Sequence, residues 1–404
     1  MRIRSSALTA ALAVTALAVT GCAGSGADEA DAAGSPYRVL VTGGISGQGA
    51  LAANAQTSVL SAKASAETVN RAGGVGGRQV EITVVDDAGD ATNAVSKLRE
   101  AIASGKTPDL FLNSGPSTIT TATLPILAQN KILSFNIGPT EDSANPEKYP
   151  LNFDLASGPA ENAETIARYI KGKGYQSVGV VHSSSAYGEV FGQAMEDALS
   201  GEGVSSTGSE EYDTAALDMT AQLQSLKNRG TQALVVDAYG APLGYLLTSL
   251  QRLDWNIPLI GNTSVAGTSL VSKPAPDGVL GTPATANLVM HVMSSTVYDA
   301  QDTAVNTMVE NMKAMGDIPS TLILADNYDA LPLVAAAANK AGSSDPEALA
   351  DALENQEVLD SAETAFSPSY HFTAESHASK PGDEAYKFVP PSPLLNGQYG
   401  NPSA

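Results

Sequence analysis

The sequence predicts an α/β protein built from two doubly wound lobes. Short apolar runs alternate with segments whose apolar residues recur at helical spacing, and this alternation occurs twice, on either side of a stretch rich in proline and asparagine at residues 139–150. Strands that are apolar throughout are typical of parallel sheets covered by helices on both faces. The chain is also too long for one small core. One parallel sheet in each lobe therefore accounts for the pattern.

The first series of elements precedes residue 139. A glycine-rich turn at residues 43–49 follows the first strand, and Gly73 and Gly74 follow the first helix, where glycine readily adopts the left-handed conformation that ends a helix. The predicted strands are residues 38–42, 79–85, 108–112 and 132–136, and the predicted helices are 53–71, 92–103 and 117–129.

The second series follows residue 150. Its predicted strands are residues 176–182, 232–237 and 257–261, and its predicted helices are 161–172, 187–199, 217–228 and 242–252. An extended segment with Pro283 comes next, at residues 279–286. Three further helices are predicted at residues 295–315, 326–341 and 346–354, before a proline-rich tail that begins near Phe366.

The N-terminus has the features of an export signal. Two arginines precede an apolar run at residues 7–20, which is shorter than the roughly 20 residues that span a bilayer. The run ends in Val-Thr-Gly-Cys, which resembles a bacterial lipobox with Cys22 as the lipidated residue. We therefore expect a signal peptide at residues 1–21, a tether at 22–36 and a lipid anchor in the outer face of the bacterial cell membrane. The alternative is an ordinary signal peptide with an incidental cysteine.

Composition excludes several classes of function. A net charge of −21 argues against binding to nucleic acid or to anionic membrane surfaces. Cys22 is the single cysteine, so a disulfide and a cysteine-based metal cluster are both excluded. The four histidines lack metal-ligand spacing, and no serine lies in a nucleophile motif. We expect no catalytic residue, no metal and no cofactor.

Four segments in order resemble one family. They are GGISGQGA, NRAGGVGGRQVEITVVDDAGD, SGPST and SAYGEVF. Together they resemble the type I periplasmic binding proteins of ABC importers, in the Leu/Ile/Val-binding branch, over residues 37–378. The resemblance implies a Venus-flytrap fold with crossovers near residues 156–158, 282–286 and 370–372. The first lobe is then 37–156 plus 286–371, and the second is 157–285 plus 372–404.

The residues and the resemblance together predict a binding site between the lobes, at the carboxyl ends of the strands. Ser117 opens a helix after a strand, where its hydroxyl and the free N–H groups suit a carboxylate, although a plain helix-capping serine is the alternative. The resemblance implies that Gly138 and Thr140 complete this side. It also implies that the rings of Tyr187 and Tyr239 close over the ligand from the second lobe.

Thr263 is the position where this sequence departs from the family. The amino-acid binders of the family carry an acidic residue there, and a buried ammonium without a partner costs several kcal/mol. Asp237 or Asp326 could replace that acid. The expected ligand is a small carboxylate that is apolar or aromatic beyond its acid end, with an amino acid as the alternative.

The resemblance implies that the protein is the substrate-binding lipoprotein of an ABC importer and delivers its ligand to a membrane permease. A sensory or regulatory subunit with the same cleft is the alternative. An exported hydrolase is a third possibility, but it requires a nucleophile and base that the sequence does not offer.

Overall fold

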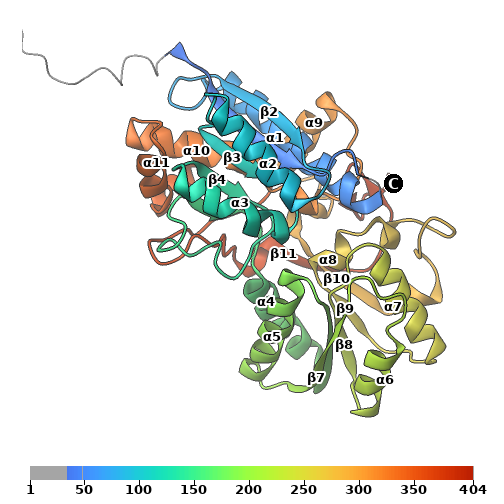
Figure 1. Ribbon diagram of the computed structural model, residues 1–404. Coiled ribbons are helices and arrows are strands. Elements are labelled where there is room, and N and C mark those ends of the chain that lie inside the picture. The colour runs from blue at the N-terminus through green and yellow to red at the C-terminus, as the bar shows by residue number, and fades with distance from the viewer. Residues whose placement is uncertain (1–33, 48, 404) are drawn as a thin grey trace, which may run out of the picture. The chain divides into compact units, whose positions relative to one another are not determined.

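A computed structural model describes residues 34–47 and 49–403 of the chain. From Pro36 onward the chain forms one folded unit that contains two lobes, each with its own sheet (Figure 1). The predicted signal peptide and the lipidated Cys22 lie outside the described residues, as does nearly all of the tether. Among the described residues, no helix combines the length and the apolar composition that a membrane span requires.

The first lobe is built on a five-stranded parallel sheet with the strand order β2-β1-β3-β4-β5. Strands β1, β3, β4 and β5 are buried on both faces, as the sequence predicts for a parallel sheet, whereas the edge strand β2 is mostly half-buried or exposed. The strands are β1 (Tyr37–Gly43), β2 (Val80–Asp86), β3 (Leu110–Asn113), β4 (Leu133–Asn136) and β5 (Asn152–Asp154).

Helices cover both faces of this first sheet. One face packs on a core that includes α1, α10 and α11, and the other packs on α2 and α3. Helix α9 lies against α1. The helices of this lobe are α1 (Gly49–Arg71), α2 (Ala91–Ala103), α3 (Ser117–Gln129), α9 (Thr303–Met315), α10 (Asn327–Ala341), α11 (Pro346–Leu353) and α12 (Gln356–Ser361).

The second lobe is built on a six-stranded sheet with the strand order β11-β10-β9-β8-β6-β7, in which only β11 is antiparallel to its neighbour. Its strands are β6 (Ser177–Ser183), β7 (Ser205–Tyr212), β8 (Ala233–Val236), β9 (Leu259–Gly261), β10 (Leu288–Met293) and β11 (Tyr386–Val389). Its helices are α4 (Pro159–Lys173), α5 (Ala186–Gly201), α6 (Thr220–Asn228), α7 (Ala241–Arg252) and α8 (Thr263–Ala266).

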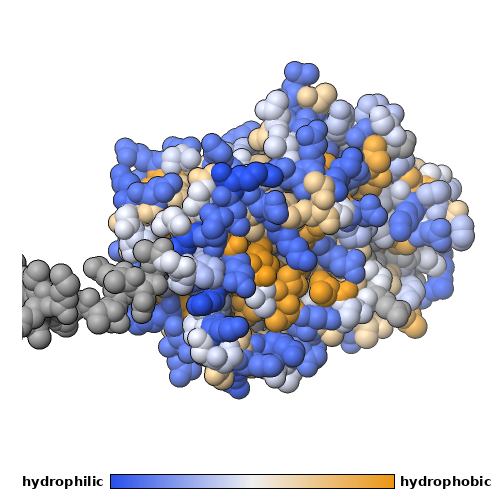
Figure 2. Space-filling view, turned by 90° about the horizontal axis from the view of Figure 1, so that it is seen from above, coloured by the Kyte–Doolittle hydropathy of each residue, from blue (hydrophilic) through white to orange (hydrophobic). Residues whose placement is uncertain are grey.

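Short elements complete the unit. A hairpin of β12 (Leu394–Leu395) and β13 (Gln398–Tyr399) packs near the end of the chain, and its Tyr399 is buried in the core of the second lobe. The 3-10 turns are Ser269–Ser272, Pro283–Thr285, Ser294–Thr296, Leu322–Leu324 and Asp383–Ala385. The face drawn in Figure 2 is largely hydrophilic, in keeping with the net charge of −21.

Two of the three crossovers lie later in the chain than the sequence suggests. The first falls between β5 and α4, at residues 155–158. The segment at 282–286 instead leads into β10, which pairs with β9, so the chain leaves the second sheet only after Met293. Tyr370 and Phe372 are buried in the first lobe, and the chain re-enters the second sheet at β11. The segments 288–293 and 372–377 therefore belong to the opposite lobes from those predicted.

Asp329 fixes the segment that precedes the third crossover. Its buried carboxylate accepts hydrogen bonds from the backbone N–H groups of Ala365, Phe366 and Ser367 at 2.8–3.0 Å. The Tyr370 hydroxyl donates a further bond at 2.9 Å. This one side chain therefore connects α10 to residues 365–370. Its oxygens accept the backbone hydrogen bonds that a helix or strand would otherwise satisfy in this segment.

Replacing Asp329 by alanine is predicted to destabilise the fold by about 3 kcal/mol or more, because several buried donors lose their acceptor at once. Urea unfolding followed by circular dichroism measures the change. Asp351→Ala, at an exposed position on α11, is the control and should stay within about 0.5 kcal/mol of the unmodified protein. Equal stability of the two variants would contradict this role.

Candidate ligand-binding site

The first turn of α3 and residue 138 form one wall of the predicted site. A Cβ atom built on Gly138 would lie 2.7 Å from the Ser117 nitrogen and 3.0 Å from the Gly115 oxygen. The backbone at 138 can therefore approach the start of α3 only because this residue is glycine. The structure thus brings Ser117 and Gly138 together.

Ser117 is the first residue of α3 and not its cap, because Pro116 holds the capping position and makes no side-chain hydrogen bond to the helix. The first N–H groups of a helix have no acceptor within the helix, so they remain able to bind an anion. Ser117 is buried, with 7% of its surface exposed. The plain helix-capping role that the sequence left open does not apply to this serine.

Thr140 is engaged within its own loop. Its N–H donates to the Ser143 Oγ at 2.8 Å, and its Oγ1 accepts from the Ser143 N–H at 3.2 Å. Ser143 in turn donates to Asp154 at 2.7 Å. The resemblance implies that both the N–H and the hydroxyl of Thr140 contact the ligand. Because the N–H already donates to Ser143, the hydroxyl hydrogen is the Thr140 donor left for a ligand.

Tyr187 and Thr263 meet in the second lobe. The Tyr187 hydroxyl accepts a hydrogen bond from Asn162 at 2.9 Å. Burial raises the pKa of the Tyr187 hydroxyl, and the charge of Asp237 raises it further, whereas the side chain of Thr263 lies close enough to lower it in part. This part of the site is therefore neutral and presents one phenol ring and two hydroxyl groups.

Tyr239 connects the two lobes through Asn54, a residue on α1. The Asn54 amide donates a short hydrogen bond to the Tyr239 hydroxyl and another to the Gly267 carbonyl oxygen at 3.0 Å. Burial raises the pKa of Tyr239 to about 12, so it is a neutral phenol at physiological pH. Sequence reasoning missed Asn54, although a polar residue among the small residues that follow the first turn was an available signal.

The two acids that could replace the missing family acid have different surroundings. Asp237 accepts hydrogen bonds on both oxygens, from the Ser183 N–H and hydroxyl at 3.2 and 2.8 Å and from Asn262 at 2.9 Å. Asp326 is equally buried, but its Oδ2 has no hydrogen-bond partner among the described residues. Asp326 therefore has an oxygen to which no described group donates, whereas both oxygens of Asp237 already accept hydrogen bonds.

The predicted site residues come from both lobes, and two of the contacts between the lobes involve elements that carry these residues. Helix α3 lies in contact with α5, so the helix that begins at Ser117 approaches the helix that carries Tyr187. The second contact is the pair of bonds made by Asn54. A separate hollow on the first lobe, lined by Glu141, Asn145 and Glu375, includes none of the predicted residues.

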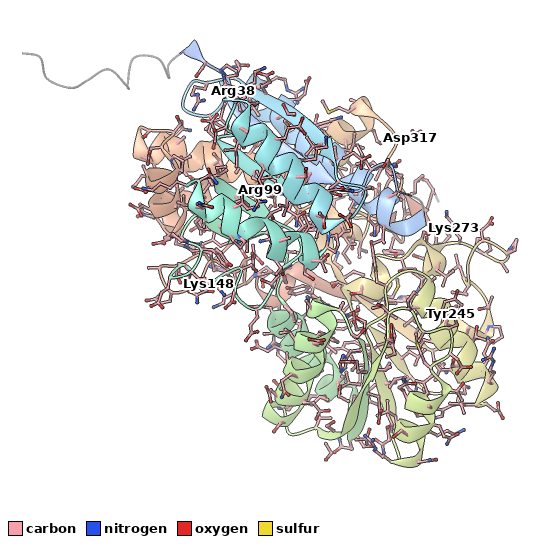
Figure 3. All side chains as sticks on the ribbon, viewed as in Figure 1. Arg38, Arg99, Lys148, Tyr245, Lys273 and Asp317 are labelled. Atoms are coloured by element: carbon pink, nitrogen blue, oxygen red, sulfur yellow. The ribbon has the colours of Figure 1, made fainter. Side chains whose placement is uncertain are left out.

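Three basic residues lie away from this region. Arg99, Lys148 and Lys273 are exposed on the outside of the lobes (Figure 3). Among the described residues, no group of three or more histidine, cysteine or acidic side chains is arranged to hold a metal ion. An anion at the start of α3 would therefore be held by N–H and hydroxyl groups.

Comparison with known proteins establishes the class of protein. A family model described as periplasmic binding protein matches residues 36–382, and the chain belongs to this family. Its members are exported solute-binding proteins that work with ABC transporter permeases and are not enzymes. The fold class and the family predicted from the sequence are thus confirmed.

Particular relatives are more distant. The leucine-, isoleucine-, valine-, threonine- and alanine-binding protein of Pseudomonas aeruginosa is 26% identical over 292 residues, which cover 71% of this chain and 74% of that protein. The type 1 periplasmic binding protein of Bordetella pertussis superposes with a TM-score of 0.72 at 22% identity, covering 87% of this chain and 96% of that one. A Rhodopseudomonas palustris solute-binding protein in complex with 3,4-dihydroxybenzoic acid gives a TM-score of 0.61 at 18% identity, covering 78% and 84%.

Replacing Asn54 by alanine is predicted to favour separation of the lobes. The variant loses both hydrogen bonds between α1 and the second lobe, which together contribute about 1–3 kcal/mol. Small-angle X-ray scattering of the ligand-free protein should show a larger radius of gyration. Gln56→Ala is the control, because this exposed side chain, among the described residues, bonds to Ile45 of the same lobe and to no other. A radius unchanged in both variants would contradict the role of Asn54.

Proposed function

We propose that this protein is the substrate-binding lipoprotein of an ABC importer and that it captures a small carboxylate-bearing solute by closure of its two lobes. The observation that carries the proposal is the start of α3. Its first turn begins with the buried Ser117 and has no side-chain cap. The backbone at residue 138 approaches this turn so closely that only glycine fits at that position. Such a helix start binds carboxylates through N–H and hydroxyl donors.

The second lobe supports a solute that is apolar or aromatic beyond its acid end, or an amino acid. Tyr187 and Tyr239 present apolar ring faces with polar hydroxyl groups at their edges. The P. aeruginosa relative binds amino acids, and the R. palustris neighbour holds 3,4-dihydroxybenzoic acid. Both kinds of ligand carry a carboxylate, which is the part of the solute that the first turn of α3 suits.

Closure follows from binding to both lobes. A solute held by Ser117, Gly138 and Thr140 on one side and by Tyr187, Tyr239 and Thr263 on the other binds the closed form better, and it shifts the population toward that form. Converting a mostly open protein into a mostly closed one requires about 5 kcal/mol of differential affinity. One carboxylate anchor and two buried rings supply energy of that order.

Ser117→Ala is predicted to weaken binding of a carboxylate by about 1–3 kcal/mol, because the anion loses a hydroxyl donor in a buried position. Titration calorimetry with a panel of amino acids and aromatic carboxylates measures the change. Thr121→Ala, one turn further along α3 and exposed, should bind as the unmodified protein does. The amides of the same acids should bind weakly to all three proteins, and identical affinities for acid and amide would refute a carboxylate site.

Cys22→Ala is predicted to release the protein from the membrane. A lipidated cysteine with more than one acyl chain anchors firmly, whereas this chain without lipid has no membrane-spanning helix in its described part. Fractionation of cells that express each form should move the variant from the membrane to the soluble exported fraction. Retention of the variant in the membrane would refute lipid anchoring at this residue.

The importer role itself is tested by uptake. Cells that lack the gene should take up less of the solute identified by calorimetry, and the gene restores uptake. Unchanged uptake together with a lost transcriptional response to that solute would assign the same binding site to a sensory subunit.

A further inference from the structure

Asp326 occupies a position where an aspartate normally caps a helix. It immediately precedes α10, and aspartate at this position usually accepts hydrogen bonds from the first turn. Here its side chain makes no capping bond, only 2% of its surface is exposed, and its Oδ2 has no hydrogen-bond partner among the described residues. The local role of a capping residue therefore does not explain why an acid is buried here.

Asp326 is held beside the carboxylate wall of the first lobe. The next residue, Asn327, donates hydrogen bonds to the Ser114 Oγ at 2.9 Å and to the Asn113 carbonyl oxygen at 3.2 Å. Ser114 and Asn113 lie at the carboxyl end of β3, and the chain reaches Ser117 three residues after Ser114. The buried acid is thus attached to the same strand end that positions the start of α3.

Tyr386 connects Asp326 to the second lobe. Burial raises the pKa of the Tyr386 hydroxyl, and the charges of Glu161 and Asp326 raise it further, which places Asp326 within electrostatic range of that ring. The Tyr386 hydroxyl is hydrogen-bonded to Ser157 in the first crossover. Tyr386 in turn interacts electrostatically with Tyr187. Asp326 is thus attached to the end of β3 through Asn327, and it lies within electrostatic range of Tyr386, whose hydroxyl bonds to the first crossover.

Among residues 34–47 and 49–403, no positively charged group is identified that compensates Asp326. The titratable groups that interact with it are Asp329, Tyr370 and Tyr386, none of which is positively charged. His291 stacks on Tyr386, but burial lowers the pKa of this histidine to about 3, so it is neutral. Burial, with the Asp329 charge in addition, raises the pKa of Asp326 well above its ordinary value. A buried acid with a free oxygen is costly unless some other group donates to it.

We propose that Asp326 accepts a hydrogen bond from the bound solute, so that the solute carries an ammonium or hydroxyl group in addition to its carboxylate. Asp326, which precedes α10, then pairs with the donor group of the solute, as the acidic residue at the position of Thr263 does in the amino-acid binders of the family. The inference rests on the proposed capture of a carboxylate between the lobes.

Matched pairs of solutes test this assignment. Each pair differs in one kind of group: leucine against 4-methylpentanoate for the ammonium, and 3,4-dihydroxybenzoate against benzoate for the hydroxyl. The unmodified protein should prefer the donor-bearing member of at least one pair by about tenfold or more. Asp326→Leu should reduce that preference to within about threefold, while affinity for the donor-free member changes by less than about threefold.

Asp326→Asn separates the two donors. Its amide oxygen can still accept from a hydroxyl, but it has no charge for an ammonium, so only the preference for leucine should be lost. Calorimetry in two buffers of different ionisation enthalpy gives a second readout. Binding of the ammonium should release a proton from Asp326, because the charged pair requires a carboxylate, whereas binding of the hydroxyl should release none.

Asp87→Asn is the matched control. Asp87 is also buried and has an Oδ2 without a partner among the described residues, but it follows β2, which lies two strands from β3. Its variant should keep the preference of the unmodified protein. Thermal unfolding of each variant verifies that it is folded.

The outcomes separate the two proposals. Carboxylates that bind with no preference within any pair, or with a preference that persists in Asp326→Leu, overturn the role of Asp326 alone. Failure of the unmodified protein to bind any of these carboxylates overturns the proposed function and, with it, this inference.

Discussion

The hydrogen bonds of Asn327 are the constraint on which the arrangement of the first lobe depends. Its amide donates to Ser58 on α1, to Ser114 and to the carbonyl oxygen of Asn113 at the end of β3, all in a fully buried position. Three elements from distant parts of the sequence are therefore fixed at one point. Because buried donors without acceptors are costly, α1, β3 and α10 cannot shift independently. The strand end that leads to Ser117 acquires its rigidity from this network.

The contact between the lobes near the predicted site consists of few hydrogen bonds, unlike the buried network within the first lobe. Asn54 reaches from α1 to Tyr239 and to the Gly267 backbone, and these few hydrogen bonds contribute far less than the burial of either core. Both lobes also share an apolar cluster in which Ala64 of α1 packs with Met293 and Tyr386 of the second sheet. Sparse bonding at Asn54 suits movement about a hinge, since a modest differential affinity for a ligand can then decide between open and closed forms. Rigidity within each lobe and weak bonding between them are both necessary for capture by closure.

The sequence predicts most of the fold because apolar strands and glycine-terminated helices depend on local residues. The prediction fails for elements that lack an apolar run or a clear helix end. Strand β7 (SSTGSEEY) is polar because it lies at a sheet edge, where all but one of its residues are exposed or half-buried. Strand β10 was not predicted, because the family resemblance implied a crossover just before it, at residues 282–286. Ser117 became a candidate from its place after a strand and Gly138 from the family resemblance, and their roles in binding stay predictions. The free oxygen of Asp326 could not be predicted, because its lack of a partner depends on which segments from elsewhere in the chain surround it.

The polar groups around the proposed site are distributed unevenly, and this distribution bears on the solute. The start of α3 offers donors, the second lobe offers phenol rings and hydroxyl groups that are neutral, and the region of the crossovers offers an acceptor at Asp326. A solute with one carboxylate and an otherwise apolar body would pair with the donors of α3 and contact the phenol rings, but it would leave the Asp326 acceptor unpaired. A solute that also carries a hydrogen-bond donor avoids that cost in free energy. The loss of an acid at Thr263 therefore does not by itself exclude amino acids, because specificity depends on the whole set of buried donors and acceptors and not on one position.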